Sequence, residues 1–221
     1  MVCLENIQQP GGAMARRRDT NYRSKWEAAC VTIVELQQQL EDERKRRRAA
    51  ERRGTVDALT RLYTRRAFDQ DGRPRFQRAK RGKTSVAMIF IDANGFKSVN
   101  DSLGHAVGDK LLVAIATALK RSKRPADLAA RKGGDEFVLF FEGLIEAKTA
   151  KVIERIHEAV SVIRLESAPD LRASVSIGVA VGVPSASLEW ADLISQADKA
   201  MYEAKTLKGT DRPTVCIRPL T

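Results

Sequence analysis

Apolar and polar positions alternate in blocks through most of the chain, and the blocks predict strands separated by helices. Short apolar runs bounded by polar residues predict strands at residues 85–91, 126–131, 137–141, 172–181 and 214–217. Apolar residues at helical spacing predict helices at residues 64–80, 107–120, 147–165 and 188–207. Strands that alternate with helices predict an α/β (α+β) fold, in which helices flank a mixed sheet.

Glycine and proline refine this prediction at two places. Gly72 and Pro74 interrupt the first helical stretch, and we expect them to break residues 64–80 into two pieces. Gly133 and Gly134 separate two apolar runs, which predicts a tight hairpin between those strands. The last predicted strand, residues 214–217, is expected to lie at an edge of the sheet.

A different pattern precedes the α/β region. Residues 22–53 contain no Gly or Pro, which predicts one long helix after a flexible leader at residues 1–20. Apolar positions recur at spacings of three and four at Trp26, Ala29, Ile33, Leu36 and Leu40. This favours a short coiled coil of about two heptads, and a lone amphipathic helix is the alternative. The predicted division is a leader (1–20), a dimerisation helix (21–54) and a folded domain (55–221).

Composition narrows the class of protein. The net charge of +11 invites a polyanion partner, but the densest basic run, residues 44–48, is interpreted as the solvated face of a helix. That helix lacks interleaved aromatic residues, so no stable nucleic-acid partner is expected. The three cysteines share no ligand spacing, which argues against zinc and against a disulfide framework. No apolar run is long enough for a membrane span and no secretory signal is seen, so a soluble, cytoplasmic protein is expected.

Carboxylates lie at two strand ends. Asp92 follows the apolar run that ends at Ile91, and Asp135 and Glu136 lie at the tip of the predicted hairpin. If these strands are neighbours, Asp92 and Asp135 converge, and a cation is needed between them. Hard oxygen ligands without nearby His or Cys favour Mg²⁺ or Mn²⁺. Taken separately, Asp92 is better explained as a helix N-cap, and the Gly-Gly-Asp-Glu sequence as an ordinary surface turn.

Several ordered motifs occur together, and in this combination the chain resembles the GGDEF domain of diguanylate cyclases over residues 57–221. The motifs are DALT at 57–60, RRAF at 65–68, IDANGFKSVND at 91–101, LGHAVGD at 103–109, GGDEF at 133–137, SIGVA at 176–180 and ADKAMYEAK at 197–205. This many matches in order and at similar spacing is far more specific than any one of them.

The resemblance implies a role for each matching residue. Asp92 and Asp135, with the backbone carbonyl of Ala93, are implied to hold two Mg²⁺ or Mn²⁺ ions in each half-site, and Glu136 to assist catalysis. Asn100 and Asp109 are implied to recognise guanine, since a carboxylate can accept from its ring N–H and its amine. The implied contacts to the GTP phosphates come from Phe96, Lys97, Gly134 and Lys205.

The implied reaction condenses two GTP molecules into cyclic di-GMP and releases two pyrophosphates. Each chain is implied to hold one GTP, so a homodimer is required, and a coiled coil before the domain would bring the two half-sites together. Arg124 and Asp127 match an RxxD site at which the family binds its product as an inhibitor. Two other functions stay open: a catalytically weak cyclic di-GMP receptor, and a basic coiled-coil scaffold.

The chain also departs from the family pattern. Asn94 stands where a second Asp is most common, and Lys132 where an aromatic or apolar residue is common. Arg61 replaces a customary glycine in the entry loop, and the segment after Lys205 is altered, so no phosphate contact is assigned to Arg212. None of these changes removes a core catalytic group.

Overall fold

A computed structural model describes residues 26, 29–42, 54–206 and 215–220. The chain divides into two compact units, Met1–Ala50 and Glu51–Thr221, and each is considered by itself. The predicted leader (1–20) and the parts of the predicted N-terminal helix at residues 21–25, 27–28 and 43–53 lie outside the described residues. The predicted boundaries at 20/21 and 54/55 stay predictions.

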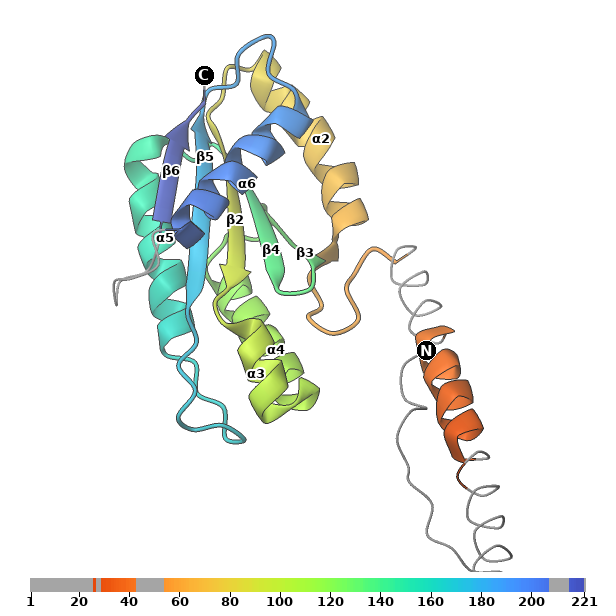
Figure 1. Ribbon diagram of the computed structural model, residues 1–221. Coiled ribbons are helices and arrows are strands. Elements are labelled where there is room, and N and C mark those ends of the chain that lie inside the picture. The colour runs from red at the N-terminus through yellow and green to blue at the C-terminus, as the bar shows by residue number, and fades with distance from the viewer. Residues whose placement is uncertain (1–25, 27–28, 43–53, 207–214, 221) are drawn as a thin grey trace, which may run out of the picture. The chain divides into compact units, whose positions relative to one another are not determined.

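The second unit is built around a six-stranded mixed sheet (Figure 1). The strands are β1 (Tyr63–Thr64), β2 (Val86–Ala93), β3 (Leu128–Gly133), β4 (Glu136–Glu142), β5 (Val175–Gly182) and β6 (Val215–Pro219). Their order is β1-β3-β4-β2-β5-β6; the outer pairs β1–β3 and β5–β6 are parallel, and the inner pairs are antiparallel. β2 lies inside the sheet, and all eight of its residues are buried.

Helices cover both faces of this sheet. They are α2 (Arg65–Arg81), α3 (Phe96–Leu103), α4 (His105–Arg121), α5 (Glu146–Ser161) and α6 (Trp190–Thr206). Side chains of α4 and α5 pack with alternate residues of β2 such as Ile89 and Ile91, whereas α2 and α6 pack with Met88 and Phe90. The sheet therefore has an apolar cluster on each face, as expected when helices cover both sides. The predicted mixed sheet flanked by helices is confirmed.

Most of the predicted elements are present with shifted ends. The hairpin at Gly133 and Gly134 is confirmed, since β3 and β4 are antiparallel and joined by two residues. β6 lies at the edge of the sheet as predicted. Asp92 was expected to follow its strand, but β2 continues through Asp92 to Ala93. The apolar run does not show this extension, because Asp92 is a buried polar residue within a strand.

The predicted break at Gly72 and Pro74 is wrong, because α2 is one continuous helix with Pro74 inside it. Tertiary packing explains this result. Phe68 and Phe76, on either side of the break, have their ring centroids 5.7 and 5.9 Å from the ring of Trp190. Proline inside a helix removes a backbone hydrogen bond and costs about 3 kcal/mol. Burial of both halves of the helix against the Trp190 side chain offsets this cost.

The N-terminal unit contains a helical segment at residues 29–42. Ile33, Leu36 and Leu40, from the predicted heptad pattern, are 54%, 58% and 50% exposed in the single chain. Apolar side chains left this open are what a coiled-coil partner would cover. None of the described helices is long and apolar enough to cross a membrane.

Candidate functional site

Strand pairing brings the predicted acidic residues together. Asp92 on β2 is paired with Glu136 on β4, and the backbone N–H of Ala93 donates to the carbonyl oxygen of Asp135 at 3.2 Å. The β3–β4 turn therefore lies beside the end of β2, at the end of the sheet where α3 begins (Figure 1). The predicted convergence of Asp92 and Asp135 is what this pairing produces.

Glycine makes the turn of this hairpin possible. Gly133 pairs with Glu136, so Gly134 and Asp135 form a two-residue turn, and Gly134 has φ +52°. That left-handed conformation suits glycine, and the missing side chain leaves the backbone open to a phosphate. Phe137, directly after the acidic pair, is fully buried and fixes the hairpin to the core.

Arg131 connects the hairpin turn to Asp57, a role that the sequence motifs did not indicate. Its Nε donates to the Gly134 carbonyl at 2.9 Å, and its Nη1 donates to Asp57 at 3.4 Å. Burial tends to raise the pKa of Asp57, but hydrogen bonds from Thr60 and the charge of Arg131 leave it below its ordinary value. Asp57 therefore stays ionised and links the entry loop to the turn.

The electrostatics of the acidic residues favour a cation. Burial raises the pKa of Asp135, and the negative charge of Asp92 raises it further. Asp92 is only 6% exposed, and the ammonium of Lys205 lies 2.7 Å from its Oδ2. Among the described residues, no group of three or more His, Cys, Asp and Glu is arranged to hold a metal ion. The two repelling carboxylates nevertheless supply hard oxygen donors, which fit Mg²⁺ or Mn²⁺.

The predicted guanine readers come from α3 and α4. The Oδ1 atom of Asn100 is buried and has no hydrogen-bond partner, an arrangement that a ligand could satisfy. A Cβ added to Gly108 would lie 2.0 Å from that oxygen, so Gly108 provides the space that Asn100 occupies. Asp109, the next residue, is exposed. Asn100 thus lies beside Gly108, and Asp109 is the next residue along the chain.

Two of the four predicted phosphate contacts lie at the start of α3, whereas Gly134 lies in the β3–β4 turn and Lys205 in the last turn of α6. Gly95 caps the helix with φ +69°, and Phe96 and Lys97 follow in its first turn. The side chain of Phe96 packs against the core, so the group that this residue can offer to an anion is its backbone N–H at the helix N-terminus. Lys97 is exposed.

Asn94 has a structural role at its unusual position. Its amide donates to the hydroxyl of Ser174 at 3.2 Å, and its Oδ1 accepts from the hydroxyl of Ser176 at 2.8 Å. These contacts join the end of β2 to the region of β5. A neutral amide makes both hydrogen bonds, so the loss of an Asp here has a local explanation.

The RxxD residues form a compact turn. The carboxylate of Asp127 accepts from the backbone N–H of Arg124 at 2.8 Å, and Asp127 is 7% exposed. Lys123 donates to the carbonyl of Asp127 at 2.7 Å, and Arg75 from α2 donates to the carbonyl of Ala126 at 2.5 Å. Arg124 itself is exposed. The buried carboxylate holds the turn, and the guanidinium is the accessible group.

Comparison with known proteins identifies the family. The model for the diguanylate cyclase GGDEF domain matches residues 54–211, so the chain belongs to the GGDEF-domain diguanylate cyclase family. It is 34% identical over 151 residues to the probable diguanylate cyclase DgcC of Escherichia coli, which covers 68% of this chain. It is 38% identical over 149 residues, or 67% of this chain, to the bifunctional diguanylate cyclase/cyclic di-GMP phosphodiesterase MucR of Pseudomonas aeruginosa. The matched regions span 40% of DgcC and 22% of MucR.

A solved structure extends the similarity to the N-terminal helix. The coiled coil and GGDEF domain of DgcB from Caulobacter crescentus, in complex with c-di-GMP, is similar with a TM-score of 0.67 and 26% identity. This match covers 89% of the present chain and 99% of the DgcB chain.

Proposed function

We propose that this chain is a diguanylate cyclase that condenses two GTP molecules into cyclic di-GMP and releases two pyrophosphates. The observation that carries the proposal is the pairing of Asp92 with Glu136, which places the GGDEF turn beside the end of β2. Membership of the family and the curated cyclases among its relatives support the same reaction. An enzyme that consumes GTP works where GTP is abundant, so we place it in the cytoplasm.

Asp92, Asp135 and the carbonyl of Ala93 are proposed to hold Mg²⁺ or Mn²⁺, with two ions in each half-site. The bound ions would offset the charge of the triphosphate and of the attacking hydroxyl. The chain itself contributes a buried Asp92 and an Asp135 whose pKa is raised by burial and by Asp92, so both carboxylates gain from a cation. Glu136 is proposed to assist as a second acidic group.

Substrate binding is proposed to use two groups of residues. Asn100 and Asp109 recognise the guanine base, and the unpartnered Oδ1 of Asn100 is the atom that supports this role. The phosphates are held by the N–H groups of Phe96 and Gly134 and by the ammonium groups of Lys97 and Lys205.

The reaction then proceeds between two copies of the site. The 3′-oxygen of one GTP attacks the α-phosphorus of the other and gives its proton to water, while the bond from that phosphorus to the bridging oxygen of the β-phosphate breaks. Pyrophosphate carries away the electron pair, and a second identical step closes the ring. Because each chain holds one substrate, the two half-sites must face each other across a two-fold axis.

A coiled coil is the proposed means of pairing the half-sites. Support comes from the exposed Ile33, Leu36 and Leu40 and from the coiled coil that precedes the similar domain of DgcB. Linking two binding units in this way raises the effective concentration of each for the other.

Product inhibition is proposed at Arg124 and Asp127. The exposed guanidinium of Arg124 suits a phosphate or a guanine edge, and the buried Asp127 fixes the turn that presents it. DgcB was solved in complex with c-di-GMP, which is consistent with binding of this product by a similar domain.

The direct test incubates the purified chain with GTP and Mg²⁺ and measures cyclic di-GMP. The proposal requires product from the native chain and its loss in Asp135→Ala. Product from Asp135→Ala would remove the metal assignment. Binding of added cyclic di-GMP without any synthesis would instead make the chain a receptor.

A further inference from the structure

Lys132 connects the acidic hairpin to the last helix. Its ammonium lies 3.0 Å from Oδ1 of Asp198 on α6 and 3.6 Å from Oε2 of Glu136 on β4. It also lies 4.6 Å from the ring centroid of Phe90 on β2. One side chain from β3 therefore contacts two further strands and a helix, and none of the roles assigned above includes it.

Its surroundings restrict where the ammonium can lie. The side chain of Lys132 is 21% exposed, so its stem is largely covered. Phe90 is 1% exposed and belongs to the buried cluster between the sheet, α2 and α6, so its ring packs against the core and presents one face to the ammonium. Asp198 gives the ammonium a charged acceptor on one side. With these two contacts in place, the third contact, to Glu136, has a defined direction.

We propose that Lys132 is a positioning residue for Glu136. Asp198 and Phe90 hold the ammonium, and the ammonium holds the carboxylate of Glu136 beside Asp92, its partner across the β2–β4 pair. A charge fixed in advance stabilises a transition state without the cost of reorganising groups during the reaction. This inference rests on the proposed cyclase function.

The arrangement also joins α6 to the site through ion pairs of opposite polarity. Asp198 accepts from Lys132, and Lys205, seven residues later on the same helix, donates to Asp92. Residues seven apart lie on one face of a helix, about two turns from each other. Asp198 and Lys205, on one face of α6, thus contact side chains of β3 and β2, and Lys132 extends the first contact to Glu136 on β4.

The test measures kcat and KM for GTP in Lys132→Met, Lys132→Arg and Asp198→Asn. Methionine keeps the apolar stem over Phe90 but removes the charge, so kcat should fall by about ten- to a hundredfold with KM changed less than threefold. Arginine keeps the charge and should restore most of kcat. Asp198→Asn keeps Lys132 but weakens its anchor and should give an intermediate loss. Lys199→Met, an exposed position on α6, is the matched charge control and should retain native kcat.

Double variants separate positioning from a general structural effect. Lys132→Met should lower kcat no further in a Glu136→Gln background, because Lys132 acts through that carboxylate. Native kcat in Lys132→Met, or a full additional loss in the Glu136→Gln background, would overturn the proposal. So would a loss of kcat that matches a loss of thermal stability in every variant. If the native chain itself makes no product, the proposed cyclase function fails instead.

Discussion

The ammonium of Lys205 lies 2.7 Å from the buried carboxylate of Asp92 and balances its charge. Lys205 comes from the last turn of α6, whereas Asp92 lies near the end of the central strand β2. The same lysine was assigned to phosphate from the sequence, and the same aspartate to metal. This contact therefore joins the proposed metal site to the proposed phosphate site. A cation that binds Asp92 must either share the carboxylate with Lys205 or displace the lysine.

Lys205→Met should separate these two effects. Without the ammonium, Asp92 and Asp135 have less positive charge near them, so Mn²⁺ alone should bind several-fold more tightly. The KM for GTP should rise about tenfold or more, because a charged hydrogen bond to phosphate is lost. Electron paramagnetic resonance of free Mn²⁺ measures the first quantity and steady-state kinetics the second. Unchanged or weaker Mn²⁺ binding would contradict this account, and Lys199→Met provides the control.

Gly108→Ala should impair substrate binding much more than it weakens the fold. The new Cβ would lie 2.0 Å from Oδ1 of Asn100 and 3.2 Å from the ring of Phe96, so the amide must move. Alanine favours a helix over glycine by about 1 kcal/mol, which offsets part of the crowding. We expect KM for GTP to rise about tenfold or more while the melting temperature changes little. Asn100→Ala should raise KM for GTP by a similar factor. The double variant should have no higher KM than either single variant. Increases in KM that multiply in the double variant would show that the two positions act independently.

Arg124→Ala should relieve product inhibition and leave turnover intact. The guanidinium is exposed, so stability should change by less than about 0.5 kcal/mol. Asp127→Ala should relieve inhibition too, but it also removes the acceptor for the Arg124 N–H and should lower the free energy of unfolding by about 1 kcal/mol. Initial rates with added cyclic di-GMP measure the inhibition. Equal inhibition of the native chain and Arg124→Ala would exclude this turn as the second site.

Stability should fall in mild acid because of His157. Burial lowers the pKa of His157 below its ordinary value of 6.5, and its Nε2 is buried without a partner. The unfolded chain therefore takes up this proton more readily. The neutral His157 therefore contributes fully to the free energy of unfolding above pH 6.5. This contribution decreases as the pH falls from 6.5 toward the lower pKa of His157 in the folded state.

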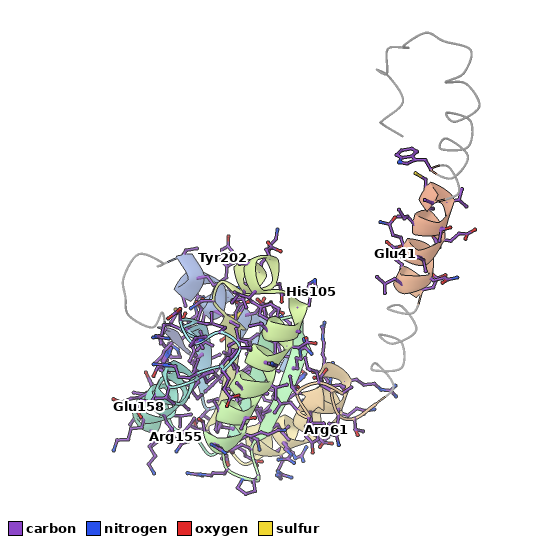
Figure 2. The ribbon with its side chains drawn as sticks, turned by 90° about the horizontal axis from the view of Figure 1, so that it is seen from below. Glu41, Arg61, His105, Arg155, Glu158 and Tyr202 are labelled. Atoms are coloured by element: carbon purple, nitrogen blue, oxygen red, sulfur yellow. The ribbon has the colours of Figure 1, made fainter. Side chains whose placement is uncertain are left out.

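Urea unfolding of the native chain and His157→Leu, at pH values between 8 and 5.5, isolates this effect. The variant should lose less stability with falling pH than the native chain does. The other histidine, His105, is exposed at the start of α4 (Figure 2), and His105→Gln is the matched histidine control. Identical pH dependence in the native chain and His157→Leu would show that burial of His157 has no such consequence.

Deletion of residues 1–53 tests the role of the exposed apolar helix. If Ile33, Leu36 and Leu40 pair two chains, the loss of activity should be large at low protein concentration and small at high concentration. Assays over a hundredfold range of protein concentration would show this trend. The same fractional loss at every concentration would mean that the segment acts in another way.

Local patterns in the sequence predicted most of the fold, and failed where distant packing decides the outcome. The apolar run before Asp92 and the two glycines before Asp135 were sufficient to predict β2 and the β3–β4 hairpin. The helix α2 continues through Pro74 because it packs against Trp190, more than a hundred residues away. Rules based on local sequence do not predict that contact. The short strand β1 and the helix α3 were missed because each is too brief to show a period.

The acidic site followed from ordered motifs, whereas its supporting residues did not. Motif spacing identified Asp92, Asp135 and Asn100, because their order along the chain is specific even where each one alone is common. Lys132 was noticed only as an unusual residue, and its link to Asp198 depends on how α6 lies across the sheet. Arg131 gave no signal at all. Contacts of this kind come from tertiary packing, which a single sequence does not display.

If two GTP molecules are joined symmetrically, the ratio of pyrophosphate to cyclic di-GMP shows it most directly. Purified chain with GTP and Mg²⁺ should release pyrophosphate and cyclic di-GMP in a ratio of about two to one, because each of the two bonds formed expels one pyrophosphate. The ratio should hold throughout the reaction, and Asp135→Ala should yield neither product. A ratio near one with a linear dinucleotide, or pyrophosphate without any dinucleotide, would contradict the account.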